Sequence, residues 1–126
     1  MKLDVIFKRL VLANIFLILV FIIAAWNVDS EIVLEFNNSF DLQDELFFLT
    51  LFWIIAYLVS CYLIYNFKKF GRQLFLIVFI LGYFIALLSG PIAFDQLTYI
   101  LDGLGTALNG ALLAILYLTP ISKKFN

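Results

Sequence analysis

The chain has 126 residues, of which 65% are hydrophobic, and its mean hydropathy is +1.10. A soluble domain contains roughly 45–50% apolar residues, so this composition excludes a water-soluble globular protein and indicates one unit embedded in lipid. The net charge of −1 hides an uneven distribution along the chain. Histidine is absent and cysteine occurs once, at Cys61, which excludes an intramolecular disulfide and predicts neither a soft-metal site nor another cofactor.

Four apolar runs follow one another along the sequence. The predicted spans are 6–26, 46–67, 73–93 and 97–119, with an outer loop at 27–45. A hydrocarbon core about 30 Å thick needs roughly 20 residues of helix, and no run alternates with a period of two as a membrane β-strand would. The sequence therefore predicts an all-α membrane protein, an antiparallel four-transmembrane-helix bundle that forms a single integral membrane domain over residues 1–126.

The first apolar run has two features of a secretory signal peptide, a basic start and a weak small-residue site after Ala25. Its uncharged core, residues 10–26, is longer than a signal requires. We therefore interpret it as a retained span, with a cleaved leader as the alternative.

The charged residues are sorted by side. All eight Lys and Arg residues fall before the first span, between the second and third, or after the fourth. The acids of the opposite side are Asp29, Glu31, Glu35, Asp41, Asp44, Glu45, Asp95 and Asp102. Only Asp4 breaks the segregation. Because loops rich in Lys and Arg stay in the cytoplasm, we expect both termini inside and the acidic loop outside the cell (inner) membrane.

The two main loops carry local expectations. Lys68, Lys69 and Arg72 surround a very short turn and are expected to contact lipid headgroups. Gly71 is expected to permit the reversal of the chain there. The outer loop mixes acids with apolar residues, so we expect it to lie on the membrane surface or over the end of the bundle. Asp41 is expected to cap the second span.

The fourth span contains a stripe of small residues. Gly103, Ala107, Gly110 and Ala114 fall at i, i+4, i+7 and i+11, on one helix face. Because lipid supplies no hydrophobic force between helices, close backbone approach over small residues holds them together. The stripe predicts a packing or oligomer interface, either with the first span or with the same helix of a second subunit.

A polar stripe runs beside the small one. Asp102, Thr106 and Asn109 fall at i, i+4 and i+7, and Asn14 on the first span is a further buried polar candidate. An ionised carboxylate in hydrocarbon is costly, so Asp102 is expected to face the bundle interior, a partner or water. In one interpretation Asn109 bridges two helices by a hydrogen bond; in the other the stripe lines a water-filled path. Beyond Asn109 the same face is apolar, so no complete pore through one subunit is expected.

The sequence contains no nucleophile–base pair, phosphate-binding loop or cytoplasmic domain, so we expect neither an enzyme nor catalytic residues. We expect a non-catalytic accessory, sensor, assembly or immunity-type component, of a size that favours a bacterial source, acting by helix–helix association. Its expected partners are the lipid bilayer and either a second copy, in a homo-oligomer, or another membrane protein. Neither nucleic acid nor a small-molecule substrate is indicated. The alternative is a small oligomeric ion channel or holin-like pore lined by Asp102 and Asn109.

Overall fold

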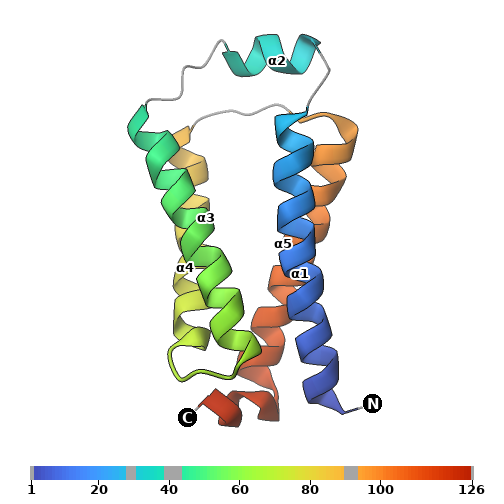
Figure 1. Ribbon diagram of the computed structural model, residues 1–126, viewed down its shortest axis with the longest axis vertical. Coiled ribbons are helices and arrows are strands. Elements are labelled where there is room, and N and C mark those ends of the chain that lie inside the picture. The colour runs from blue at the N-terminus through green and yellow to red at the C-terminus, as the bar shows by residue number, and fades with distance from the viewer. Residues whose placement is uncertain (1, 28–30, 39–43, 90–93, 126) are drawn as a thin grey trace.

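The computed structural model describes residues 2–27, 31–38, 44–89 and 94–125 (Figure 1). The helices are α1 (Leu3–Trp26), α2 (Glu31–Asn38), α3 (Asp44–Tyr65), α4 (Gly71–Ser89), α5 (Gln96–Leu118) and a 3-10 helix, η1 (Pro120–Phe125). Within these ranges there is no strand. Four of the helices, α1, α3, α4 and α5, are long and apolar enough to cross a membrane. The protein is therefore all-helical and membrane-embedded.

The helix ends differ from the predicted spans by a few residues. α1 begins at Leu3, three residues before the predicted start, with Asp4 in its first turn, where a carboxylate offsets the positive end of the helix dipole. α3 ends at Tyr65 and α4 ends at Ser89. The expected cap Asp41 lies outside the described residues.

A short helix, α2, occupies part of the predicted outer loop. With eight residues it is too short to cross a bilayer. In Figure 1 it lies across one end of the molecule, roughly perpendicular to the long helices. Both Glu31 and Glu35 are exposed on it, as are Ile32 and Leu34. It therefore carries acids and apolar side chains together.

The long helices pack as two pairs, α3 with α4 and α1 with α5 (Figure 1). α3 and α4 are consecutive, and a short turn joins them. α1 and α5 come from opposite ends of the chain, so their pairing brings the two termini to the same end of the molecule. The two pairs, rather than four equivalent helices, are the units of this fold.

The turn between α3 and α4 reverses at a phenylalanine. Phe67 has φ 53°, in the left-handed region; the amide of Lys68 donates to the carbonyl of Leu63 (2.9 Å), and that of Phe67 to Ile64 (3.2 Å). This is the hydrogen-bond pattern of a Schellman cap. Gly71, expected to permit the reversal, is instead the first residue of α4, where a Cβ would lie 2.9 Å from backbone atoms of Leu63 and Ile64. Glycine is needed there for close approach of the two helices.

The buried core lies in one half of the molecule. Its members are at most 2% exposed: Phe7, Val11, Tyr57, Cys61, Ile64, Phe75, Val78, Leu112, Leu116, Ile121 and Phe125. All of them belong to η1 or to the half of each long helix nearer the termini. The ring of Phe67 extends this core, with centroids 5.7 Å from Phe7 and 5.4 Å from Phe125. The two helix pairs are therefore joined mainly at this end.

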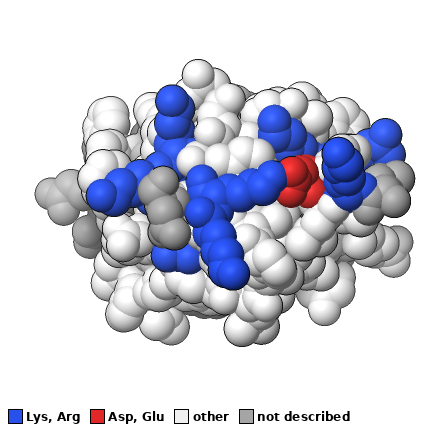
Figure 2. Space-filling model, turned by 90° about the horizontal axis from the view of Figure 1, so that it is seen from below, with Lys and Arg blue, Asp and Glu red and all other residues white. Residues whose placement is uncertain are grey.

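The same end carries the basic residues. Figure 2 views this end and shows Lys and Arg gathered across it. Asp4 forms an ion pair with Lys124, and the ammonium of Lys8 lies 5.4 Å from the centroid of the Phe67 ring. All eight basic residues of the chain lie within the described ranges at this end. The molecule therefore has a basic end, and α2 lies at the opposite one.

Candidate functional site

Three polar side chains from three different helices meet near the middle of the molecule. The amide of Asn14, on α1, donates to the hydroxyl of Tyr57 on α3 (2.5 Å) and to the amide oxygen of Asn109 on α5 (2.9 Å). The hydroxyl of Tyr57 donates to the same oxygen of Asn109 (2.6 Å). Asn14 is 1% and Tyr57 2% exposed. We call these three residues the polar triad.

The depth of the polar triad follows from helix geometry. At a rise of 1.5 Å per residue, Asn14 lies about 17 Å from the start of α1, and Asn109 about 20 Å from the start of α5. The side chains of Asn14 and Tyr57 are buried from solvent, so the amides and the phenol hydrogen-bond to one another. The triad thereby fixes the α1–α5 pair against α3.

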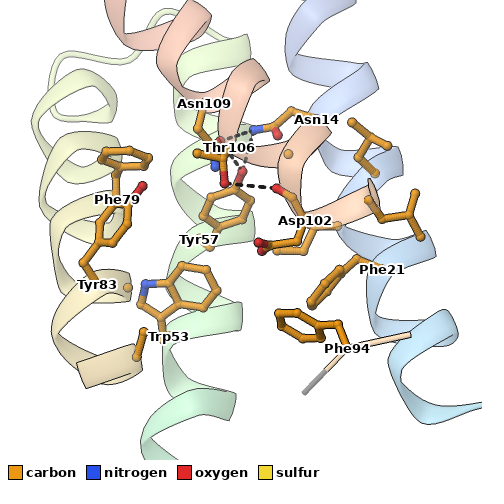
Figure 3. A pocket seen from close by; sticks show the side chains of 16 residues that line it. Asn14, Phe21, Trp53, Tyr57, Phe79, Tyr83, Phe94, Asp102, Thr106 and Asn109 are labelled. Carbon is orange, nitrogen blue, oxygen red and sulfur yellow. Dashed lines mark hydrogen bonds between the residues drawn. The ribbon is translucent and has the colours of Figure 1, made fainter. Parts of the chain in front are cut away.

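A cavity of about 410 Å³ begins at the polar triad and extends toward the α2 end of the molecule, between the two helix pairs (Figure 3). Its lining comes from α1, α3, α4 and α5 and from Phe94, which precedes α5. The polar triad forms its floor. The packed core lies beyond that floor, so the cavity is confined to one half of the molecule.

Six aromatic rings line the cavity in three contacting pairs. Their centroids are separated by 5.3 Å in Trp53–Tyr57, 5.2 Å in Phe79–Tyr83 and 6.0 Å in Phe21–Phe94. The last two pairs meet edge to face, a favoured geometry for aromatic pairs. In Figure 3 the Trp53–Tyr57 and Phe79–Tyr83 pairs lie on one side of the cavity and Phe21–Phe94 on the other.

Trp53 is held in place from two directions. Its indole N–H donates to the carbonyl of Val78 on α4 (2.7 Å). Its ring also lies against Gly82, where an added Cβ would sit 2.9 Å from the indole Cζ2. Any larger residue at Gly82 would displace the ring, so the glycine and the hydrogen bond together set this wall of the cavity.

The remaining wall comes from α5 and carries the polar stripe predicted from the sequence. Asp102, Thr106 and Asn109 all line the cavity. The hydroxyl of Thr106 donates to the backbone carbonyl of Asp102 (3.0 Å). In Figure 3 the carboxylate of Asp102 points into the space between the aromatic pairs. It is the single charged group among the described residues that line the cavity.

The small-residue stripe lies elsewhere on α5. Gly103, Ala107, Gly110 and Ala114 are all exposed, and none of them lines the cavity. A Cβ built at Gly103 or Gly110 would meet no atom within 4 Å. Within one chain this face therefore has room for larger side chains.

The predicted acidic loop is divided among several elements. Glu31 and Glu35 lie exposed on α2, while Asp44 and Glu45 are the first residues of α3. Asp29 and Asp41 lie outside the described residues. Where the chain is described, no group of three potential metal ligands occurs.

Asp95 caps α5. Its carboxylate accepts a hydrogen bond from the backbone amide of Thr98 (2.9 Å). Thr98 lowers the pKa of Asp95 below its ordinary value, because it stabilises the ionised carboxylate. Asp95 thus adds a negative charge at the α2 end of the molecule.

The residues expected to contact headgroups lie at the basic end. Lys68 and Lys69 are exposed in the turn between α3 and α4. Arg72 packs its guanidinium over the ring of Tyr117, 5.0 Å from its centroid. Of these three residues, the two lysines therefore present exposed ammonium groups, and the guanidinium of Arg72 is stacked on an aromatic ring.

Several lining residues carry no signal in the sequence. Trp53, Phe79, Gly82 and Tyr83 lie in helices that are apolar on all sides, so periodicity does not indicate which face turns inward. Gly82 lies four residues after Val78, whose carbonyl accepts the hydrogen bond from Trp53, and its role becomes apparent once the packing of α3 on α4 is known. No family model, curated protein or solved structure matches this chain.

Proposed function

We propose that this protein is a non-catalytic binding protein of the cell membrane that holds a small apolar or amphipathic ligand between its two helix pairs. The observation that carries the proposal is the cavity of about 410 Å³, with aromatic walls and a polar floor. Ligand sites are commonly pockets of roughly 300–1,000 Å³, lined by apolar side chains with a few placed polar groups. The sequence indicated no such ligand, because the lining is assembled from all four long helices.

The proposed topology is an antiparallel bundle with both termini in the cytoplasm. The gathering of every Lys and Arg at the end that holds the termini supports it, since basic loops are retained inside. In this orientation the floor of the cavity lies near mid-membrane and the cavity extends toward the outer surface, with α2 above it.

The geometry favours binding over conduction. Below the polar triad, Ile64, Leu112 and Leu116 are fully buried and fill the space between the helix pairs. Asp102 and Asn109 line a cavity within one chain, and this placement lends no support to a pore formed between subunits.

The test fills the cavity with a side chain. Gly105 lines the cavity, and a Cβ there meets nothing within 4 Å; Gly105→Phe is therefore expected to occupy the cavity without a backbone clash. In a Trp26→Phe background Trp53 is the sole tryptophan. The measurement is saturable energy transfer from Trp53 to the neutral fluorophore N-phenyl-1-naphthylamine, with the protein in lipid nanodiscs.

We expect saturable transfer in the parent and its loss in Gly105→Phe. Leu104→Phe is the matched control, because it places the same aromatic side chain on the same helix, at an exposed position that belongs neither to the cavity lining nor to the small-residue stripe. Equal transfer in both variants would show that the fluorophore binds elsewhere and would overturn the proposal.

Association through α5 is a separate proposal. Its support is the exposure of all four small residues on one helix face, which leaves them available to a second copy of this chain or to another membrane protein. The two proposals use different faces of α5 and are compatible.

A further inference from the structure

We propose that the cavity selects organic cations, with Asp102 as the counter-ion of a quaternary ammonium or protonated amine attached to an apolar body. This inference rests on the proposed function, because it assigns a class of ligand to the same cavity.

Among the described residues, the carboxylate of Asp102 has no partner. Within the described residues, no hydrogen bond or ion pair reaches its side-chain oxygens, and no Lys or Arg lines the cavity. Asp102 lies about 9 Å from the start of α5, below the expected membrane surface. Its side chain is exposed on the cavity wall, so a ligand can reach it, and an unpaired carboxylate attracts a cationic ligand.

The polar triad does not compete for that ligand's charge. The amide of Asn14 and the hydroxyl of Tyr57 both donate to Asn109. Asn14, Tyr57 and Asn109 are neutral groups, so the floor carries no charge. Asp102 therefore decides the charge preference of the cavity.

The aromatic rings suit the same ligand. In Figure 3 the carboxylate of Asp102 lies between the Trp53–Tyr57 pair on one side and the Phe21–Phe94 pair on the other. A cation within about 6 Å of an aromatic face is attracted by the ring quadrupole, and most strongly by tryptophan. The same rings offer apolar surface to the body of the ligand. An organic cation uses both properties, whereas an anion or a hydrated metal ion does not.

The field over the cavity has the same sign. Glu31, Glu35 and Asp95 lie at the α2 end, and all eight basic residues lie at the other. Two long helices end at the α2 end and two begin there, so their dipoles largely offset one another. The carboxylates then set the local potential and raise the concentration of cations near the cavity.

The experiment compares two probes that differ in one atom. The first is (3-phenylpropyl)trimethylammonium; the second is its neutral isostere, in which a carbon replaces the quaternary nitrogen. Binding of each tritiated probe is measured by equilibrium dialysis against protein in phosphatidylcholine nanodiscs, with empty nanodiscs as the reference. We expect the parent to bind the cation at least about tenfold more tightly than the isostere.

Asp102→Asn removes the charge and keeps the shape of the side chain. We expect it to abolish the preference for the cation while the isostere binds as in the parent, which also shows that the cavity is intact. Asp102→Glu keeps the charge and is expected to retain the preference. Asp4→Asn is the control, because it removes a carboxylate at the basic end of the molecule, away from the cavity and its lining; it is expected to change the preference by less than about twofold.

The outcomes separate the two proposals. Equal binding of both probes to the parent, or a preference that survives Asp102→Asn, overturns the assignment of organic cations and leaves the binding function standing. Failure of both probes to bind overturns the assignment and the binding function together.

Discussion

Tyr57 joins the two halves of the molecule. Its hydroxyl belongs to the polar triad, while its ring contacts Trp53 in the cavity wall and Phe75 in the core, at centroid distances of 5.3 and 6.0 Å. The side chain of Tyr57 therefore lies at the boundary between the packed core and the cavity. Through its hydrogen bonds, this buried hydroxyl helps to fix the position of α3 relative to α1 and α5.

We predict that Tyr57→Phe lowers the free energy of unfolding by about 1–3 kcal/mol, because both Asn14 and Asn109 lose a hydrogen-bond partner away from water. Unfolding in mixed micelles with increasing dodecyl sulfate measures the change. Tyr62→Phe is the matched control, since Tyr62 lies on the same helix, is 64% exposed and forms no side-chain hydrogen bond in the described structure. Equal losses in the two variants would contradict a structural role for the triad.

Residue type alone misleads at the turn between α3 and α4. A glycine beside a short loop predicts the site of reversal, yet Phe67 takes the left-handed conformation and Gly71 permits close packing. Phe67 is held there by ring contacts with Phe7 and Phe125. These contacts come from distant parts of the chain, so local sequence does not reveal them.

At the scale of elements, α5 presents two different faces. One face carries Asp102, Thr106 and Asn109 into the cavity; the other carries the exposed small-residue stripe. The sequence predicts both stripes, because polar and small residues at helical spacing stand out against an apolar background. It does not predict which neighbour each stripe meets, since that depends on the rotation of every helix about its axis.

We predict that Gly110→Leu weakens association of the protein in lipid by roughly tenfold, because a branched side chain keeps two backbones from close approach. Open space around Gly110 in one chain means that the fold of the monomer should be preserved. Amine crosslinking in nanodiscs, followed by electrophoresis, measures the oligomer.

Asp102→Asn is the control for this experiment and is expected to leave the crosslinked species unchanged, because Asp102 lines the cavity. If Gly110→Leu also leaves them unchanged, the small-residue stripe faces lipid and has no partner.

At the scale of the whole molecule, the sequence predicts four helices of spanning length and a separation of charge between two ends. Length and composition suffice for these properties. The pairing of α1 with α5 was only one of two alternatives, and the cavity and the short helix α2 were not predicted. These features depend on contacts between segments far apart in the chain. In addition, the sequence of a helix that is apolar on all sides does not indicate which face turns toward the interior.

The orientation of the chain is tested by labelling intact cells with a membrane-impermeant maleimide. The native Cys61 is fully buried and should stay unlabelled. We predict that Glu35→Cys is labelled from outside, whereas Lys69→Cys is labelled only after the membrane is permeabilised, because basic residues stay in the cytoplasm. Labelling of Lys69→Cys in sealed cells, with none at Glu35→Cys, would reverse the orientation of the cavity.

The placement of the core in one half of the molecule bears on how strictly the cavity can discriminate by size. The buried apolar core joins the two helix pairs at the basic end, so a movement of the pairs apart at the α2 end would not expose that core. A cavity whose walls can move apart in this way accommodates ligands of different shapes. Recognition would then depend more on the sign of the ligand's charge than on its shape. Chemically unrelated amines would therefore compete for the same binding site.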